Sequence, residues 1–393
     1  PRAMIYLDHN ATAPLAPEAA AAMEPFLAGA RPANPGSAHA AGAAARSAAD
    51  AARARVAALI NARPDEVVFT SGGTESDNAA IWGAALARPD RRTVVVSAVE
   101  HAAVREPADR LARLLGVRVV VVPVGPDGLV DPGRVGEAVG PDTAVVSVMW
   151  ANNETGVVQP VADIAGLVRA RGAWLHVDAV QAVGRVPVDF ASCGADLLSV
   201  SSHKLHGPAG AGALIVRKGV RIEPLITGGP QEAGRRGGTE NVAGVAGFGA
   251  AAELAARWLA DGGPARLAEL RDRLERGVLA AVPGAVVTAG GSPRLCNTTH
   301  IRFPGRRAEA VLMGLDELGV CVSVGAACSS GSLRPSHVLT AMGLSDAEAR
   351  SAVRFSLGRG NTADEIDRTI AAVAEVVARL PVGGDPADDL LLE

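Results

Sequence analysis

One cysteine occupies an unusual setting in this sequence. Cys328 lies in the stretch VSVGAACSSGSLRPSHVL, residues 322–339, where its near neighbours are almost all Gly, Ala or Ser. A core cysteine usually has large apolar neighbours, and a disulfide cysteine needs a partner. Small residues instead favour a mobile, exposed backbone. The pattern therefore predicts a thiol that has to reach a reaction partner.

A glycine pair at the end of an apolar run suggests a phosphate site. In VVFTSGGTESDNAAIWGAALA, residues 67–87, a strand is expected to end at Thr70 and a helix to begin near Thr74. Gly72 and Gly73 would let the backbone approach a ligand, and the new helix would offer free N–H groups to an anion. The spacing fits neither a Walker loop nor a dinucleotide fingerprint. The alternative is an ordinary strand-to-helix turn capped by Thr74.

An acidic residue ends another apolar run. In AWLHVDAVQAVG, residues 173–184, Asp178 would lie at the carboxyl edge of a parallel sheet, where α/β folds bind ligands. A carboxylate there suits a cationic partner such as a protonated pyridine nitrogen. Gln181 follows one turn later and could bond a ring substituent. The alternative for Asp178 is a helix N-cap.

A lysine follows the next strand-like run. In DLLSVSSHKLHGPAG, residues 196–210, Lys204 comes after a Ser-Ser-His triplet that includes Ser201 and His203. A lysine buried in a cleft has a lowered pKa and can form a Schiff base with an aldehyde. An isolated lysine is usually a solvated surface residue. The order of phosphate turn, aspartate and lysine favours the Schiff-base interpretation, with Ser201 and His203 as flanking phosphate or hydroxyl donors.

Two further polar residues would lie at the same edge of the sheet. His101 follows the run TVVVSA, and Asn153 lies in WANNETG. A histidine there could stack on a flat cofactor and move protons near neutral pH, and Asn153 could bond a ring oxygen. The alternatives are a helix-capping histidine and a turn asparagine.

Composition excludes several other classes of protein. The chain has 393 residues, 48% of them hydrophobic, and a net charge of −4 from 38 basic and 42 acidic residues. The basic residues are scattered, so neither a nucleic-acid surface nor a basic membrane helix is expected. No apolar run approaches the ~20 residues of a membrane span, and the N-terminus lacks a signal-peptide pattern. The four cysteines form no C-x-x-C pair, so we expect no disulfide framework, no metal site and a cytoplasmic location.

These residues must be positioned by alternating strands and helices. Seven β-branched runs are strand candidates, and Ala-rich helical stretches separate several of them, which predicts βαβ units and a mostly parallel, buried sheet. Closer spacing of the later runs predicts an antiparallel edge. From about residue 242 the pattern changes to that of a smaller α+β domain. The seven runs are EVVFTS, RTVVVSA, VRVVVVPV, TAVVSVMWA, AWLHVDAV, DLLSVSS and AGALIV.

Motifs in one order over residues 5–375 resemble the cysteine desulfurases, pyridoxal phosphate (PLP) enzymes of the class V aminotransferase family. The resemblance implies a type I PLP-dependent transferase fold, α/β, with a mainly parallel seven-stranded sheet. It implies a large domain at 16–258, a small domain from 1–15 and 259–393, and a homodimer. The motifs are YLDHNATAPLAPE, NPGSAH, FTSGGTESDN, VEHAAV, NNETGVVQP, HVDAVQAVG, SSHKLHGPAGAGAL, GRRGGTENVAG and RFSLGR.

The resemblance also implies site roles. Lys204 would hold PLP covalently, Asp178 would pair with the pyridinium nitrogen, and His101 would stack on the ring. Gln181 and Asn153 would face the phenolic oxygen. Arg354 would bind the substrate carboxylate, with help from Asn34 and Asn153. The phosphate would be bound by Gly73, Thr74, Ser201 and His203, with Thr239 reaching the site of the other subunit.

Cys328 aligns with the family's catalytic cysteine and resembles its longer-loop group. The implied reaction converts L-cysteine to L-alanine and leaves a persulfide on Cys328, with His101 a candidate acid or base. A sulfur-acceptor protein would follow, either an Fe–S scaffold or a thiolation enzyme. Selenocysteine lyase, another class V enzyme and a non-catalytic scaffold are the alternatives. The other three cysteines are expected to be structural. Local departures from the family's motifs occur at Ala13, Ala209, Pro230 and Ala233.

Overall fold

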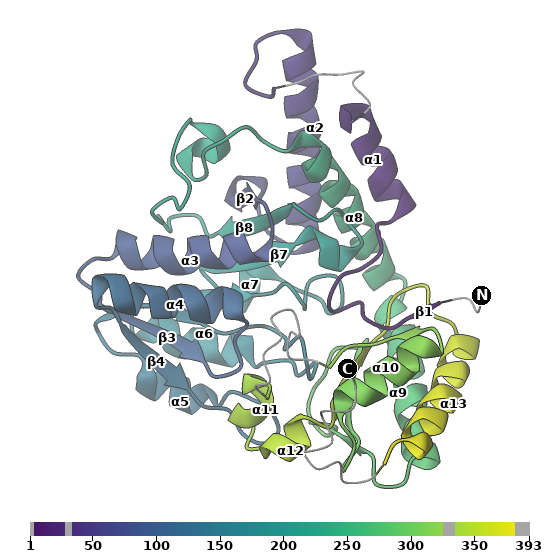
Figure 1. Cartoon of the computed structure of the whole chain (residues 1–393). Helices are drawn as coiled ribbons and strands as arrows, with labels where there is room; N and C mark the ends of the chain where they lie inside the picture. The colour runs from purple at the N-terminus through teal and green to yellow at the C-terminus, as the bar shows by residue number, and fades with distance from the viewer. Residues whose placement is uncertain (1–3, 28–33, 325–334, 382–393) are drawn as a thin grey trace.

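A seven-stranded sheet forms the centre of the larger part of the molecule (Figure 1). The computed structural model describes residues 4–27, 34–324 and 335–381. Each of the seven predicted runs forms one strand of this sheet, in the order β2-β8-β7-β6-β5-β3-β4. The strands are β2 (Val67–Thr70), β3 (Thr93–Ser97), β4 (Arg118–Val122), β5 (Thr143–Ser147), β6 (Trp174–Asp178), β7 (Leu197–Ser201) and β8 (Gly212–Val216).

The antiparallel strand of this sheet does not lie at its edge. β8 pairs antiparallel with both β7 and β2, so β2 occupies the edge and the expected antiparallel edge was wrong. β2 consequently runs parallel to the other strands, and its carboxyl end meets theirs at one edge of the sheet. Strands β3, β5 and β7 are buried along their whole length, which explains their uninterrupted apolar and small polar sequences.

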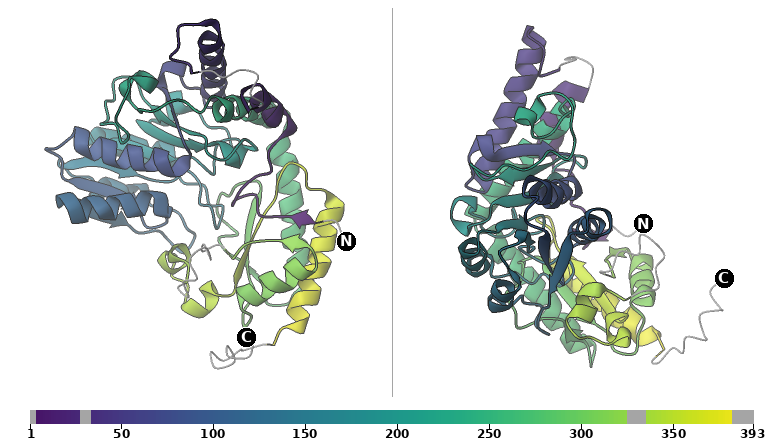
Figure 2. Two further views of the ribbon diagram at one scale, coloured as in Figure 1. Left: turned by 45° about the horizontal axis from the view of Figure 1, so that its top comes forward. Right: turned by 90° about the vertical axis from the view of Figure 1, so that its left-hand side faces the viewer.

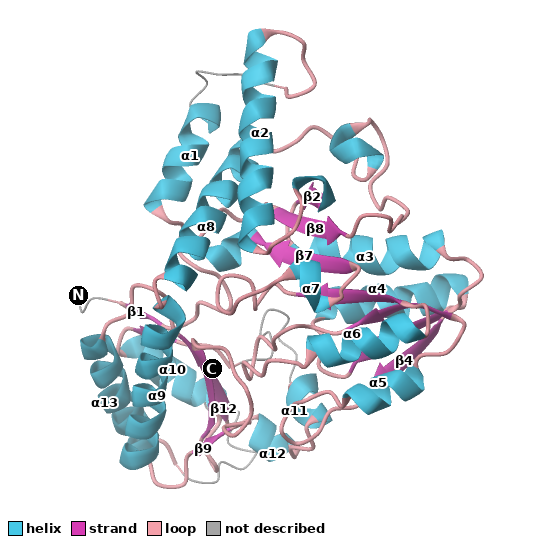
Figure 3. Cartoon of the chain, turned by 180° about the vertical axis from the view of Figure 1, so that it is seen from behind, coloured by secondary structure: helices cyan, strands magenta, loops and turns pink. Residues whose placement is uncertain are grey.

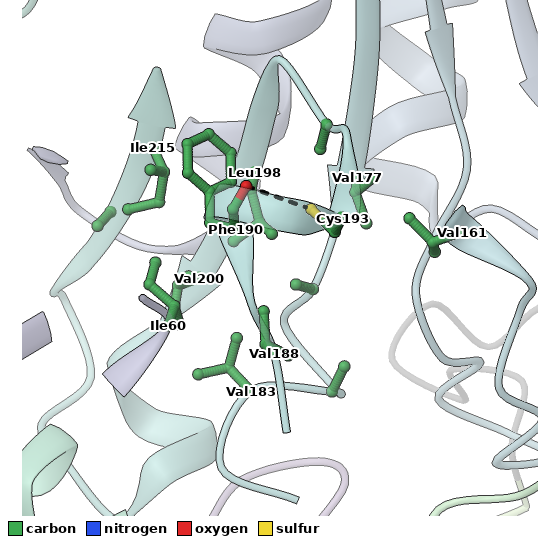
Figure 4. Close-up of a cluster of buried hydrophobic side chains, with 14 of the residues drawn as sticks. Ile60, Val161, Val177, Val183, Val188, Phe190, Cys193, Leu198, Val200 and Ile215 are labelled. Atoms are coloured by element: carbon green, nitrogen blue, oxygen red, sulfur yellow. Dashed lines mark hydrogen bonds between the residues drawn. The ribbon is translucent and has the colours of Figure 1, made fainter. Parts of the chain in front are cut away.

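Helices cover both faces of the sheet. On one face α3 (Gly73–Ala87) and α4 (Ala102–Leu115) pack on alternate strand residues such as Val94 and Val96. On the other face α2 (Ala40–Leu59), α6 (Val161–Ala170), α7 (Phe190–Cys193) and α8 (Val242–Ala260) contribute to a second core (Figure 3). Figure 4 shows part of that core, where Cys193 lies among Phe190, Val188 and Leu198. α1 (Pro17–Leu27) packs on α8, and α5 (Pro132–Ala138) on α6.

A separate hydrophobic core fills the smaller part of the molecule, which Figure 2 shows from two further directions. It combines the N-terminal strand with elements from the last third of the chain. These elements are β1 (Ile5–Tyr6), α9 (Gly263–Ala281), β9 (Val286–Val287), β10 (Thr298–Arg302), α10 (Ala308–Glu317), β11 (Val320–Cys321), β12 (Ala352–Ser356) and α13 (Ala363–Arg379). β11 is only two residues long: it ends at Cys321, and beyond it Ser323 forms an isolated bridge with Arg354.

Short elements connect these two parts. α11 (His337–Ala341) and α12 (Asp346–Ala349) contribute to a small cluster in which Val338 and Met342 meet Val99 and Met149 of the large part. Among the described residues, no helix combines the length and apolarity needed to cross a membrane.

Candidate active site

The predicted site residues gather where parallel strands end. Gly73 follows β2, His101 follows β3, Asn153 follows β5, Asp178 ends β6, and Lys204 follows β7. Because these strands run in one direction, their carboxyl ends meet at one edge of the sheet. Strand pairing therefore brings together residues separated by up to about 130 positions in the sequence.

Lys204 is a half-buried amine held by backbone carbonyls. It lies in the 3₁₀ turn η2 (Ser202–Leu205), and its Nζ donates to the carbonyl oxygens of Asn10 and Ala11, the latter at 2.7 Å. Burial, followed by the charges of Arg185 and Arg354, lowers the pKa of Lys204 to about 7. Near neutral pH a large share of this lysine is the free amine, the form that attacks an aldehyde.

Asp178 is a buried carboxyl at the end of β6. Its Oδ1 accepts a hydrogen bond from the backbone N–H of Val180 at 2.9 Å. Burial raises the pKa of Asp178, and the charges of His101 and Lys204 oppose that rise. A cation placed against Asp178 would stabilise its ionised form, which fits pairing with a protonated ring nitrogen.

His101 both caps a helix and faces a cavity. It is the N-cap of α4, and its Nδ1 accepts from the backbone N–H of Ala103 at 3.1 Å. The capping alternative is therefore correct, and it is compatible with a role in the site because the ring is exposed. The cap also sets the tautomer, since an accepting Nδ1 leaves the proton on Nε2. His101, Thr74 and Asn78 line a cavity of about 460 Å³.

The turn before α3 fits a phosphate group. α3 begins at Gly73, so its first N–H groups have no partner within the helix. Beside the turn the buried Ser201 hydroxyl has no hydrogen-bond partner. A Cβ on Gly73 would come within 2.8 Å of Val180 Cγ2, so any side chain here would have to displace Val180. Free backbone donors and an unpartnered hydroxyl are the donor set that an oxyanion requires.

His203 borders the same region as a neutral imidazole. Burial, followed by the charges of Lys204 and Arg185, lowers its pKa to about 4. Its Nδ1 and the Thr12 hydroxyl lie 3.1 Å apart.

Arg354 joins three parts of the chain. From β12 its guanidinium donates to Asp8 Oδ1 at 2.7 Å and to the carbonyl oxygen of Asn153 at 3.0 Å. Gln181 lies nearby and is itself held, since its Nε2 donates to the carbonyl oxygen of Asn10 at 3.0 Å. Arg354 is 4% exposed, so a carboxylate that reached it would bind a largely desolvated, oriented guanidinium.

Two predicted residues lie apart from this cluster in the chain. Asn34 lines a different cavity, of about 740 Å³, together with Arg46, Arg53 and Glu232, and no other predicted site residue lines it. Its Oδ1 accepts from the backbone N–H of Gly36 at 2.8 Å. Thr239 is exposed between η3 (Gln231–Gly234) and α8.

Cys328 lies outside the described residues, but both flanks of its segment are held beside the site. Before the segment, Ser323 exchanges two backbone hydrogen bonds with Arg354, at 3.1 and 2.7 Å. After it, Ser336 Oγ donates to Glu154 Oε2 at 2.6 Å. Since Glu154 adjoins Asn153, the described residues that flank positions 325–334 lie next to Arg354 and Asn153.

Comparison with known proteins agrees with this geometry. The sequence profile described as aminotransferase class V matches residues 5–369. The chain belongs to the class V aminotransferase family. A protein named cysteine desulfurase from Cereibacter sphaeroides is 50% identical over 377 residues, 96% of each chain.

Solved structures of related proteins share the fold. A NifS-like protein has a TM-score of 0.89 at 35% identity, with coverage of 95% of this chain and 99% of its own. A structure described as SspA in complex with cysteine has a TM-score of 0.80 at 33% identity, with coverage of 91% and 100%. The resemblance to cysteine desulfurases and the α/β fold class are therefore confirmed, and PLP is the cofactor on which this family depends.

Several residues of this family site were not singled out from the sequence. Asp8, Asn10 and Arg185 hold Arg354, Lys204 and Gln181, respectively. The motif YLDHNATAP contains the first two and could have indicated them, because polar residues that follow a short strand often line a site. No local signal marked Arg185.

A buried polar network around His176 was also not predicted from the sequence. The imidazole of His176, inside β6, lies 2.8 Å from Ser147 Oγ and 3.0 Å from Ser199 Oγ, with Asp77 Oδ1 at 3.5 Å. Burial, followed by the charge of Asp178, raises the pKa of Asp77. The network adjoins Asp178, because His176 lies two residues before it in β6.

The other cysteines are all free. Cys193 and Cys296 are buried, in keeping with a structural role, whereas Cys321 is only half-buried and is not a core residue. β11 ends at Cys321, and the two-residue β1–β11 pairing does not enclose it. No cluster of three or more metal-ligating side chains occurs within residues 4–27, 34–324 and 335–381.

Proposed function

We propose that this protein is a PLP-dependent cysteine desulfurase that converts L-cysteine to L-alanine and retains the sulfur as a persulfide on Cys328. The observation that carries the proposal is Lys204, a half-buried amine with a pKa of about 7 beside the carboxyl of Asp178. The names of the relatives support the substrate, as does a related structure described as a complex with cysteine.

The cofactor would be held by the residues at the carboxyl ends of the strands. When bound, PLP supplies an electron sink for a carbanion next to the substrate nitrogen. Lys204 would bind it covalently and, once released, would accept the substrate Cα proton at Nζ. Asp178 would pair with the ring nitrogen and His101 would stack on the ring. Gln181 and Asn153 would contact the phenolic oxygen. The phosphate would be bound by Gly73, Thr74, Ser201 and His203 of the same chain and by Thr239 of the partner subunit.

The substrate would be oriented by its carboxylate. Arg354 would bind that group together with Asn153 and Asn34, and Asp8 keeps the guanidinium in place beforehand. Asn34 lies apart from Arg354 within one chain, so its contribution would be made across the dimer.

Sulfur transfer would use the segment between Ser323 and Ser336. The Cys328 thiolate would form an S–S bond to the substrate sulfur while the Cβ–S bond breaks, and protonation of Cβ would complete alanine. His101 Nε2 is the candidate proton carrier. The described residues on both sides of Cys328, Ser323 and Ser336, are held beside Arg354 and Glu154, which supports a role for this cysteine at the site.

The organisation of the protein follows from the same proposal. The large domain would span 16–258, and the small domain would combine 1–15 with 259–393, in agreement with the two hydrophobic cores. The working form would be a cytoplasmic homodimer, and an Fe–S scaffold or a thiolation enzyme would accept the persulfide sulfur.

The test is a stoichiometric assay of three purified proteins. Wild type, Cys328→Ala and Cys321→Ala would be incubated with L-cysteine and a reductant, and alanine and sulfide would be quantified. We expect equal amounts of both products from wild type and Cys321→Ala, and at least a hundredfold less from Cys328→Ala. Substantial alanine and sulfide from Cys328→Ala would refute the role of this thiol. Loss of PLP absorbance with neither product from wild type would refute the activity itself.

A further inference from the structure

A small, partly open cavity lies beside Lys204, lined by residues from both parts of the molecule. Its volume is about 20 Å³, enough for one water-sized species. The charged and polar residues that line it are His9, Arg185, Lys204, His206, Asn297 and Arg359, and no lining residue is acidic. The cavity is therefore surrounded by donors and positive charge.

Arg185 is a buried cation whose partners are all neutral. It is 7% exposed, and its guanidinium donates to the carbonyl oxygen and Oε1 of Gln181 and to the carbonyl oxygen of His9. Burial lowers its pKa only to about 10, so it stays charged at neutral pH. A buried charge without a counter-ion is costly unless another group compensates it.

Arg359 adds a second uncompensated cation. Its guanidinium carbon lies 5.4 Å from the centre of the Trp258 ring, and burial lowers its pKa to about 10. Within the described part of the chain it forms no ion pair with a carboxylate. Glu18 influences its pKa but lies beyond ion-pair distance.

His9 presents an unpartnered nitrogen. His9 is 7% exposed, and its buried Nδ1 has no hydrogen-bond partner. The ring is fixed in place because Gly358 has no side chain: a Cβ there would lie 2.0 Å from His9 Cε1. Burial lowers the pKa of His9 to about 3, so the ring is neutral, and a hydrogen bond to the backbone of Tyr6 partly opposes that shift.

We propose that this cavity binds one small monovalent anion of the size of chloride, placed among Arg185, Arg359 and His9. Two guanidinium groups without carboxylate ion pairs among the described residues would supply the charge, and the small volume favours a monovalent ion over phosphate or sulfate. The site does not depend on the proposed desulfurase activity, and neither test below measures turnover.

The first test locates the ion directly. Crystals of the holoenzyme grown in sodium bromide would be measured at the bromine absorption edge. We expect an anomalous peak in the cavity for wild type, Arg359→Lys and the surface control Arg276→Gln, and no peak for Arg359→Gln. Density in the cavity without an anomalous signal would show a water molecule and overturn the proposal. So would bromide bound only beside Arg354.

The second test measures binding in solution. The thermal midpoint of the holoenzyme would be followed as sodium chloride replaces sodium gluconate at constant ionic strength. We expect a saturable rise of about 1–3 °C for wild type and Arg276→Gln, and none for Arg359→Gln. Equal responses from wild type and Arg359→Gln would contradict the proposal. If Arg359→Gln does not fold, the wild-type bromide map decides alone.

Discussion

The chemistry of single residues in this protein follows from where burial places their charge. Glu100 is buried and Lys204 half-buried next to the site, and the loss of solvent moves their pKa values in opposite directions. A buried ammonium loses its proton more readily, whereas a buried carboxyl keeps it. Each change favours the neutral form. For Lys204 this is the nucleophilic form, and for Glu100 it is the form with the smaller free-energy cost of burial.

Lys204 should react with PLP at a lower pH than an ordinary lysine. Because the free amine is the nucleophile, the rate at which apoprotein takes up PLP should rise through about pH 7 and then level off. Stopped-flow absorbance would measure it. The chain has only one other lysine, the exposed Lys218. After borohydride reduction, Lys218→Ala should retain covalent PLP and Lys204→Ala should not; label on Lys218 would contradict the assignment.

Glu100 should make stability depend on pH. It accepts from Ser97 Oγ and from the Met149 N–H, and burial raises its pKa from 4.5 to about 8. Across that window the folded protein keeps the proton and the unfolded chain has released it. Stability should therefore fall as pH rises from about 4.5 to 8, by at most about 1.4 kcal/mol per pH unit, and level off above.

The neutral variant isolates this effect. Glu100→Gln cannot ionise, so the difference in thermal midpoint between wild type and this variant should change across the window. The exposed Glu137→Gln is the control and should follow wild type. Parallel pH profiles for wild type and Glu100→Gln would show that Glu100 is ionised in the folded protein.

Elements in this protein approach closely where their residues are small. α2 has the sequence AAGAAARSAADAARARVAAL and packs lengthwise on α8, with Ala52 facing Gly249. A Cβ on Gly249 would lie 2.6 Å from Ala52 Cα, which is backbone and cannot turn aside. The abundance of alanine thus reflects close helix packing as well as helix propensity.

Replacing helix glycines by alanine should distinguish the stability lost through disturbed packing from the stability gained through higher helix propensity. Gly249→Ala should lower the free energy of unfolding by about 1–3 kcal/mol, because the two helices must move apart. Gly166 lies in α6 with nothing within 4 Å of its hypothetical Cβ, so Gly166→Ala should be neutral or stabilising by up to about 1 kcal/mol. Denaturant unfolding would measure both, and equal effects would contradict this account of the α2–α8 contact.

At the scale of the whole molecule, the site lies where two hydrophobic cores meet. Arg354 belongs to a strand of the smaller part, yet its guanidinium contacts Asp8 from the N-terminal segment and the Asn153 carbonyl of the larger part. The same strand holds Ser323 at the start of the segment that carries Cys328. If the substrate carboxylate binds Arg354 as proposed, its binding is coupled to the relative position of both parts.

Replacing Arg354 should weaken substrate binding more than it changes the cofactor. Arg354→Lys keeps the charge but loses the two-pronged geometry, so KM for L-cysteine should rise about 10–100-fold. The PLP absorbance spectrum should stay unchanged. The control is Arg302→Lys. Arg302 lies two positions from His300, the cross-strand partner of Arg354, and pairs with Glu348. An unchanged KM for Arg354→Lys would show that Arg354 does not bind the substrate carboxylate.

The sequence by itself determined the seven strands of the large sheet, the principal helices and the order of the chemistry-bearing motifs. These are local properties: β-branched runs, helical periodicity and glycine turns act over a few residues. Lys204, Asp178 and His101 were predicted because each follows such a run, and parallel strands deliver their carboxyl ends to one edge.

Tertiary structure alone decided the rest. The internal position of β8, the shortness of β11 and the Asp8–Arg354 ion pair depend on contacts between segments far apart in the chain, about which local patterns carry no information. The same holds for the cavity beside Lys204. Arg185, Arg359 and His9 are ordinary polar residues in the sequence, and only burial against one another makes their charges and open donors significant.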